Sequence, residues 1–432
     1  MHSNPSLKKV LKPVHLWALA VGLVISGEYF GWNLGWDVAG TGGFFIATIL
    51  VTVFYVTFIF SFTELTAAIP QAGGPFTYAF KALGPLGGVI AGYATLVEFL
   101  LAPPAVAFAL GSYVHFLHPV FPVLYVAVGC YVVFTIINML GIKESAMFSL
   151  IVTLLAVAEL LMFMGIVAPG FKWENFKQDA MPFGWGGVFA AIPFAIWFYL
   201  AIEGVAMVAE EVKDPQRTIP KGYISSIVTL TLLALGVMFF TGGVTNWHNL
   251  SRIDYPLPEA ISIVLGKQNS WTKIFAGIGL FGLIASFHGV IVSYSRQIYA
   301  MARSGYLPEV LAAVHTKFRT PHYAMIAGSI VGIIALCIGN TSQVITLSAL
   351  GAVVMYIISM ISLFVLRRKQ PAMERPFKVP LYPWFPLIAL VLGIVCLAAI
   401  VYYNLLMSVV FFGVLALIII VFMTYRKSVH RS

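Results

Sequence analysis

The chain has 432 residues, of which 60% are hydrophobic and 9% are charged, with a formal net charge of +9. A water-soluble protein usually has about a quarter of its residues as Asp, Glu, Lys and Arg, because its surface must be solvated. The composition therefore excludes a soluble enzyme, a disordered chain and a nucleic-acid-binding module. It predicts a protein whose surface faces a lipid bilayer.

A short basic stretch precedes the first apolar run. Lys8, Lys9 and Lys12 could form the start of a secretory signal peptide, but the run that follows is too long and lacks a small-residue cleavage site. We therefore interpret this run as the first membrane span. The three cysteines lie in apolar runs at wide spacing, which predicts neither a disulfide framework nor a Cys-type metal site, and we expect no cofactor.

Apolar runs long enough to cross a bilayer recur along the whole chain. A hydrocarbon core about 30 Å thick requires roughly 20 apolar residues per helix. Helices are favoured over a barrel because the runs are continuous rather than alternating. We therefore predict an all-α integral membrane protein with twelve transmembrane helices. The predicted spans are 14–34, 43–65, 86–113, 121–140, 145–168, 187–209, 224–245, 274–295, 322–339, 343–366, 383–403 and 406–425.

The distribution of Lys and Arg between alternate loops predicts the orientation. With the N-terminus inside, only five of the 25 basic residues fall in outer loops. Because inner loops of membrane proteins carry an excess of Lys and Arg, we expect both termini in the cytoplasm and the chain in the plasma (inner) membrane. The basic loops would attract anionic lipid head groups, so the net charge requires no nucleic-acid partner. The five outer residues are Lys172, Lys177, Arg252, Lys267 and Lys273.

The first predicted span is interrupted near its middle. Gly22, Gly31 and the run Ser26-Gly27-Glu28 place poor helix formers inside an apolar helix. A charge at the bilayer centre costs ~2.5–3.5 kcal/mol, so Glu28 is expected to face the bundle interior or a wet cavity. An unwound stretch at this place would free backbone amides and carbonyls to bind the polar groups of a ligand.

The sixth predicted span has a similar interruption. Pro193 is followed a little over two turns later by Glu203 and Gly204, again near the middle of the span. Interruptions at corresponding places in two halves of a chain are typical of transporters with discontinuous helices around a central substrate site. Trp197 lies between them, and its ring either packs in the core or binds an ammonium group. We therefore predict a binding site between the two breaks.

Other residues deep in the predicted spans have two interpretations each. Gly27 and Gly204 could simply let neighbouring helices pack closely. Glu98 precedes a double proline that predicts a kink, and a functional and a structural role are equally open. His288 either titrates near neutral pH or forms a hydrogen bond in the core. Glu159 has no helix breaker beside it, which favours a structural hydrogen bond to a neighbouring helix.

Five segments stand in order along the chain: residues 22–30, 64–78, 138–143, 197–220 and 295–308. In that order and at that spacing, they resemble the amino acid/polyamine/organocation permease superfamily. The resemblance covers essentially the whole chain and implies one transporter domain, 1–432. It implies two five-helix inverted repeats, here 14–168 and 187–366, and two peripheral helices in 383–425. It also implies secondary active transport, with substrate at the breaks in helices 1 and 6.

Within the superfamily, residues 25–33 and 286–297 resemble the ethanolamine permeases most. Members that carry amino acids usually have Gly, then Ser, Thr or Ala, then Gly at the first break, where bare amides receive the substrate carboxylate. Here the third position is Glu28. Its charge would repel a carboxylate in a low-dielectric site and attract an ammonium group. At the second break, Ala201 stands where many relatives have Gly, which leaves the extent of unwinding open.

The sequence and the resemblance together predict import of ethanolamine or a closely related small amine, coupled to H⁺ or Na⁺. Glu28 would pair with the ammonium group, and Trp197 would form an aromatic wall or gate. The candidates for ion coupling are Glu203, Glu98 and His288. The predicted substrate-binding residues are Ser26, Gly27, Glu28, Tyr29, Trp197 and Glu203.

Three alternatives compete with this interpretation. The first keeps the fold and makes the chain an amino acid permease or exchanger. The second is a membrane-embedded enzyme, against which stands the lack of an HExxH, GxSxG or paired-carboxylate loop motif in the sequence. The third is a channel, for which a selectivity-filter loop or a ring of repeated charges would be expected.

Overall fold

The structure is a computed structural model that describes residues 9, 11–71, 73–140, 146–267, 269–318 and 320–429. Lys8, residues 141–143 of the third family segment and the first residue of the predicted span 145–168 lie outside these ranges. The described residues form an all-helical protein, as predicted. Two stretches of chain come together in a single isolated bridge, between Leu11 and Val212.

The first half of the chain follows the predicted spans closely. α3 and α4 extend beyond the spans predicted for them because each continues across a glycine with positive φ, Gly40 and Gly84 respectively. Two short helical segments, η1 and α7, lie in a region predicted as a loop. The elements are α1 (Pro13–Val24), α2 (Ser26–Tyr29), α3 (Leu34–Ala68), α4 (Gly74–Leu117), α5 (Val123–Met139), α6 (Ala146–Val167), η1 (Ala168–Gly170) and α7 (Trp173–Lys177).

The second half also follows the prediction, with α11 as an additional helix between the predicted seventh and eighth spans. Pro256 occupies the first position of this helix, where the missing N–H costs nothing. The elements are α8 (Gly184–Ala190), α9 (Ile192–Trp197), η2 (Ile202–Glu211), α10 (Pro215–Gly242), η3 (Trp247–Asn249), α11 (Pro256–Leu265), α12 (Ser270–Arg303), η4 (Glu309–Ala312), α13 (His322–Ile338), α14 (Thr341–Lys369), α15 (Trp384–Tyr403) and α16 (Leu405–Val429).

Nine helical segments of the described chain are long and apolar enough to cross a membrane. The other three predicted spans coincide with α1, α5 and α13, which have 12, 17 and 17 residues. At 1.5 Å per residue these helices are about 18 to 26 Å long, shorter than a hydrocarbon core of about 30 Å. The chain is therefore a multi-pass membrane protein, and the number twelve stays a prediction.

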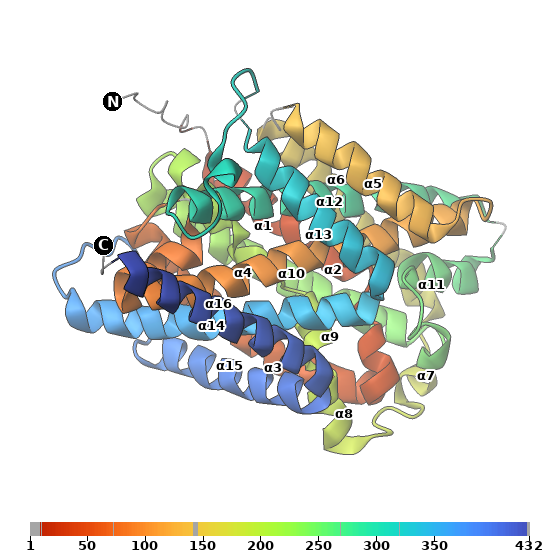
Figure 1. Cartoon of the computed structure of the whole chain (residues 1–432). Coiled ribbons are helices and arrows are strands. Elements are labelled where there is room, and N and C mark those ends of the chain that lie inside the picture. The colour runs from red at the N-terminus through yellow and green to blue at the C-terminus, as the bar shows by residue number, and fades with distance from the viewer. Residues whose placement is uncertain are drawn as a thin grey trace.

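The helices enclose the two interrupted segments. α1 packs against α6, α10 and α12, while α9 packs against α3 and α14. α4 runs through the bundle in contact with both α12 and α14 (Figure 1). α15 and α16 lie together on one side, where they contact α14 (Figure 1). Both breaks therefore lie inside the helix bundle and not on its lipid-facing surface.

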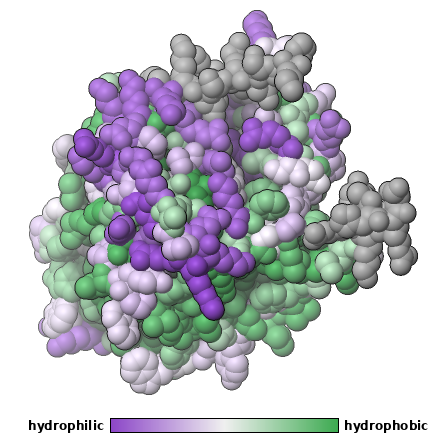
Figure 2. Space-filling view, turned by 90° about the vertical axis from the view of Figure 1, so that its left-hand side faces the viewer, coloured by the Kyte–Doolittle hydropathy of each residue, from purple (hydrophilic) through white to green (hydrophobic). Residues whose placement is uncertain are grey.

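The surface agrees with a bilayer setting. On α16, Leu406 is 70% exposed and Leu417 is 61% exposed, so large apolar side chains face outward where no other described helix covers them. The end of the bundle at which α14 finishes is different. The last turn of α14 contains Arg367, Arg368 and Lys369, and hydrophilic residues gather across the middle of that end of the bundle (Figure 2).

One buried carboxylate fixes the connection between α14 and α15. Glu64 near the end of α3 is 1% exposed and accepts hydrogen bonds from Arg367 Nε at 2.8 Å and from the backbone amide of Val379 at 2.8 Å. Arg375 Nε lies 3.3 Å from Glu64 Oε1, and the same guanidinium donates to the carbonyls of Leu366 and Met373. These bonds hold the 370–383 connection against α3.

Candidate substrate and coupling site

The first break lies between α2 and α3. α1 ends at Val24, α2 covers only Ser26–Tyr29, and Phe30 then takes extended dihedral angles of φ −162° and ψ 174°. Side chains replace the missing helical donors at the break. Trp32 Nε1 donates to the carbonyl of Glu28 at 3.1 Å, and the Tyr113 hydroxyl of α4 donates to the carbonyl of Tyr29 at 3.2 Å. The carbonyls of Glu28 and Tyr29 are therefore satisfied where the helix stops.

The second break lies between α9 and η2. α9 ends at Trp197, and the chain resumes at Ile202 as a 3₁₀ helix. Ala201 has φ 75° and ψ 6°, in the left-handed region that favours glycine. Its amide donates to Glu98 Oε1 of α4 at 3.2 Å. The alanine therefore does not prevent the interruption, and the neighbouring carboxylate helps to hold it.

The two breaks touch each other directly. A Cβ atom added at Gly27 would lie 2.3 Å from the carbonyl oxygen of Trp197, so only glycine permits this approach of the two backbones. Gly31, with φ +85°, lies under the Trp197 indole, and Phe30 contacts the same indole edge-on at a centroid distance of 5.6 Å. Gly204 packs similarly against Leu23 and Phe99. Gly27 and Gly204 therefore both let neighbouring segments pack closely.

A small cavity lies between the breaks. Its accessible volume of about 10 Å³ is enough for about one water molecule. Ser26 and Trp197 line it, whereas Gly27, Glu28, Tyr29 and Glu203 do not. α4 and α12 complete the wall. The lining residues are Leu23, Val24, Ser26, Ala102, Val106, Trp197, Leu200, Ala201, Ser286 and Val290.

The two serines in this wall already have partners. The hydroxyls of Ser26 and Ser286 lie 2.8 Å apart, and Ser286 Oγ donates to the carbonyl of Leu23 at 2.7 Å. Ser286 therefore ties α12 to the last turn of α1. A cation entering at this point would have to compete with these bonds for the same oxygen atoms.

Glu28 is fully buried, and neither of its carboxylate oxygens has a hydrogen-bond partner within the described ranges. The ion pairs of the described chain do not include it. A buried charge without a partner is costly, and buried polar groups in proteins are nearly always hydrogen-bonded. Glu28 is thus a carboxyl group at the first break with its acceptor capacity unused.

Glu98 and Glu203 form a second acidic centre, separate from Glu28. Both are fully buried, and neither Glu98 Oε2 nor Glu203 Oε1 has a hydrogen-bond partner within the described ranges. The Tyr356 hydroxyl of α14 lies 2.9 Å from Glu203 Oε2 and 3.4 Å from Glu98 Oε1, and it is 3.1 Å from the Tyr55 hydroxyl of α3. Helices α3, α4 and α14 and the segment η2 therefore meet at one carboxyl pair.

The remaining sequence candidates lie elsewhere in the bundle. His288 of α12 is 7% exposed, and its ring lies 6.4 Å from that of Phe134 on α5. Tyr29 contacts α6, where its hydroxyl lies 2.7 Å from Glu159 Oε2. Tyr356 was not singled out from the sequence. The only signal for it is that each buried carboxyl group needs a donor, and the sequence does not say which tyrosine supplies it.

The fold and the paired breaks define a membrane transporter with a small central cavity. Residues 11–427 match the model of the amino acid permease family. The chain therefore belongs to this family, which confirms the superfamily resemblance. The names of the family and of its members point to transport rather than to enzymatic activity.

Relatives in three bacteria carry names that span different substrates. An uncharacterized transporter of Rhizobium meliloti is 31% identical over 91% of this chain and 86% of its own length. A branched-chain amino acid permease of Bacillus subtilis is 28% identical over 89% and 86%. A low-affinity putrescine importer of Escherichia coli is 29% identical over 72% and 71%. The family thus includes members named for amino acids and members named for amines.

Proposed function

We propose that this protein imports ethanolamine or a closely related small amine across the plasma membrane by alternating access, coupled to an ion gradient. Glu28 is the single observation that carries the proposal. It is a buried carboxyl group at the first helix break with no partner within the described ranges. An ammonium group would supply the missing charge and up to three hydrogen-bond donors.

The neighbourhood of Glu28 supports a cation rather than an amino acid carboxylate. A carboxylate brought within about 4 Å of Glu28 would repel it by roughly 4 kcal/mol at an effective dielectric constant of 20. Trp197, which lines the cavity and has no partner for its Nε1 within the described ranges, would offer an aromatic face to the ammonium group or a donor to the substrate hydroxyl.

Opening of the site is part of the proposal, because the central cavity holds about one water molecule. Substrate entry would therefore require the indole of Trp197 to swing away from Gly31, which would expose Glu28 to the cavity. A second cavity of about 460 Å³ opens between the start of α4, the end of η2 and the end of α12. We assign it to the inner end of the transport path, next to Lys81, Glu210 and Arg303.

We assign the ion coupling to a proton held between Glu98 and Glu203. Both carboxyl groups face the Tyr356 hydroxyl, and two negative charges placed around one hydroxyl would repel each other, so a proton on one of the two relieves this repulsion. Glu98 also accepts from the amide of Ala201, so a change in its charge would act directly on the second break. Tyr356 supplies a donor to either carboxylate. His288 lies outside this centre, beside Phe134.

The proposal includes the finer architecture expected from the sequence. It has twelve spans, with α1, α5 and α13 completing the nine longer segments, and two inverted repeats over 14–168 and 187–366. It places 383–425 at the periphery and both termini in the cytoplasm. Labelling of single introduced cysteines with a membrane-impermeant thiol reagent tests this orientation. A cysteine in the α11–α12 connection should be labelled from outside, and labelling of one in the α3–α4 connection from outside would contradict the orientation.

The second candidate is an amino acid permease or exchanger of the same fold. It is favoured by the relative named as a branched-chain amino acid permease, which matches 89% of the chain. Uptake of labelled ethanolamine into proteoliposomes, in competition with choline, putrescine, leucine and serine, separates the two. The proposal predicts inhibition by small amines and little by amino acids; inhibition by amino acids alone would select the second candidate.

The proton assignment has a separate test. An inward proton gradient should drive ethanolamine accumulation in sodium-free buffer, and Glu203→Gln should abolish accumulation while leaving exchange of bound substrate. Accumulation that depends on sodium and not on the proton gradient would contradict the assignment.

A further inference from the structure

One buried acid lies outside both acidic centres. Glu159 in the middle of α6 is 3% exposed, and its Oε2 accepts a hydrogen bond of 2.7 Å from the Tyr29 hydroxyl. That hydroxyl also lies 3.1 Å from the carbonyl of Ala156, one turn earlier on the same helix. Tyr29 directly follows Glu28 and ends α2. Glu159 is therefore one hydrogen bond and one peptide unit away from the candidate substrate residue.

The helix that carries Glu28 cannot hold its own position. α2 has four residues, and a single helical turn is unstable by itself because nucleation is unfavourable. It continues from α1 through Ile25, its Ser26 hydroxyl contacts Ser286 of α12, and three further bonds hold its other end. Tyr113 of α4 holds the Tyr29 carbonyl, Trp32 holds the Glu28 carbonyl, and Glu159 of α6 holds the Tyr29 side chain. Of these three, only the Glu159 bond is made to a side chain of this segment, while the other two are made to backbone carbonyls.

A glycine face on α12 accommodates this arrangement. A Cβ atom added at Gly279 would lie 3.0 Å from the Tyr113 ring and 3.1 Å from Glu159 Oε1. A Cβ atom added at Gly282 would lie 2.9 Å from the Tyr29 ring. Gly277, on the same helix, has nothing within 4 Å of such an atom. The two crowded glycines thus lie where α12 passes the Tyr29 and Glu159 side chains, and Gly277 is a natural control.

We propose that Glu159 is a positioning residue for the substrate site: through its hydrogen bond to Tyr29 it fixes α2, and so sets the direction of the Glu28 carboxyl group. The inference rests on the proposed role of Glu28. It differs from a direct role in attracting the substrate, since the bond to Tyr29, rather than the negative charge of Glu159, is what acts. The two roles predict different results for glutamine and alanine at this position.

Uptake kinetics separate the two roles. Glu159→Gln keeps a carbonyl acceptor for the Tyr29 hydroxyl, so KM for ethanolamine should rise less than about threefold. Glu159→Ala and Tyr29→Phe both remove the bond, and each should raise KM about tenfold with little change in the maximal rate. The double variant should also raise KM about tenfold rather than a hundredfold, because the two changes remove the same interaction. A Glu159→Gln defect as large as that of Glu159→Ala, with Tyr29→Phe unaffected, would overturn the proposal.

Amide hydrogen exchange without substrate keeps this test independent of the transport proposal. In lipid nanodiscs, residues 25–31 should exchange faster in Tyr29→Phe, Glu159→Ala and Gly279→Ala than in wild type, and at the wild-type rate in Glu159→Gln and Gly277→Ala. Unchanged exchange in Tyr29→Phe, which keeps the ring and should fold normally, would refute the positioning role. Faster exchange together with no ethanolamine uptake by the wild type would refute only the transport proposal.

Discussion

Gly27→Ala should show how tightly the two breaks depend on each other. The added Cβ atom would lie 2.3 Å from the carbonyl oxygen of Trp197, 3.2 Å from its carbonyl carbon and 3.3 Å from Cα of Phe198. These are backbone atoms, so no side-chain rotation can relieve the contact. Ordinary van der Waals contacts between a Cβ atom and its neighbours begin at 3.4 Å. The first and second breaks would therefore have to separate by about 1 Å along this direction, in a region where the interior is closely packed.

Overpacking of this kind costs about 1–3 kcal/mol or more, against which an alanine in a helix gains up to about 1 kcal/mol over glycine. We therefore expect Gly27→Ala to lower the midpoint of thermal unfolding in detergent and to raise KM for transport. Gly277→Ala is the matched control, because it makes the same chemical change at an open helical position, and it should be neutral or stabilising. Equal midpoints for the two variants would refute the close contact between the breaks.

Three further predictions concern single residues. Ala201→Gly should stabilise the protein by about 1 kcal/mol in thermal unfolding, since a left-handed alanine costs about 1–2 kcal/mol that glycine avoids; a destabilised variant would contradict the strain. Burial raises the pKa of Asp254 to about 6, so its contribution to the free energy of unfolding is greatest below about pH 4 and falls by about 3 kcal/mol as the pH rises past 6. Asp254→Asn should flatten this pH dependence, and it should raise the unfolding midpoint at pH 7.5 but not at pH 4. Glu64→Gln should cost about 3–5 kcal/mol because it leaves two guanidinium groups without their carboxylate, whereas the exposed Glu374→Gln should change the unfolding midpoint little; similar small effects of both would mean that the 370–383 connection is not held by charge.

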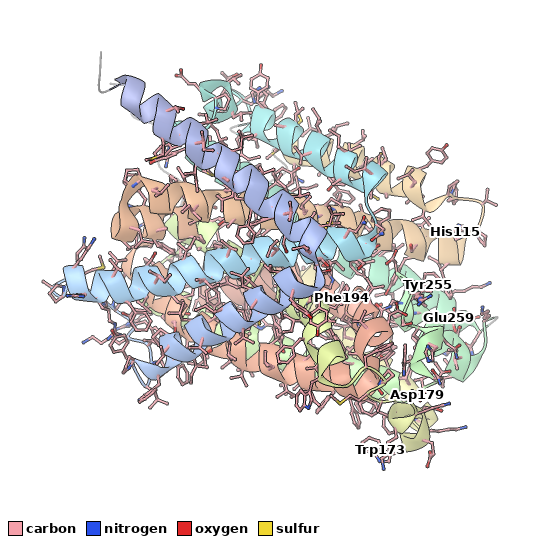
Figure 3. The ribbon with its side chains drawn as sticks, turned by 60° about the horizontal axis from the view of Figure 1, so that its bottom comes forward. His115, Trp173, Asp179, Phe194, Tyr255 and Glu259 are labelled. Carbon is pink, nitrogen blue, oxygen red and sulfur yellow. The ribbon has the colours of Figure 1, made fainter. Side chains whose placement is uncertain are left out.

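The Asp254 prediction applies at the end of the bundle opposite the last turn of α14. The Thr341 hydroxyl at the start of α14 donates to Asp254 Oδ2 at 3.0 Å. Tyr255 and Glu259, which follow Asp254 at the start of α11, lie at this end together with His115 of α4 (Figure 3). The bond from Thr341 favours the ionised carboxylate and so opposes the effect of burial, which is the larger of the two on the pKa of Asp254.

Much of the fold was readable because the bilayer imposes a simple rule on length. Helices α3, α10 and α14 coincide with continuous apolar runs, and no tertiary information is needed to find them. The breaks were also readable, since Gly27, Glu28 and Glu203 contradict their apolar surroundings. The short helix α11 was missed because a ten-residue apolar segment between spans carries no length signal.

The partners of the polar residues could not be predicted, because they depend on packing between distant segments. Glu98 and Tyr356 are 258 residues apart in sequence, and Tyr29 and Glu159 are 130 apart. The hydrophobic pattern predicts that each of these residues is buried, but it does not predict which of them are in contact. Likewise, alanine at position 201 left the extent of unwinding at the second break open. The structure shows a left-handed φ there together with a hydrogen bond to Glu98, 103 residues away, and sequence patterns encode neither.

The central proposal is that Glu28 binds the ammonium group of a small amine. Equilibrium binding of labelled ethanolamine to purified protein tests it most directly, with Glu28→Gln and Glu28→Gly compared with the conservative control Glu374→Gln. Losing a charge-assisted bond worth about 1.5–3 kcal/mol should weaken binding by about tenfold to a hundredfold in both Glu28 variants, and not in the control. Wild-type affinity in both Glu28 variants would contradict the assignment.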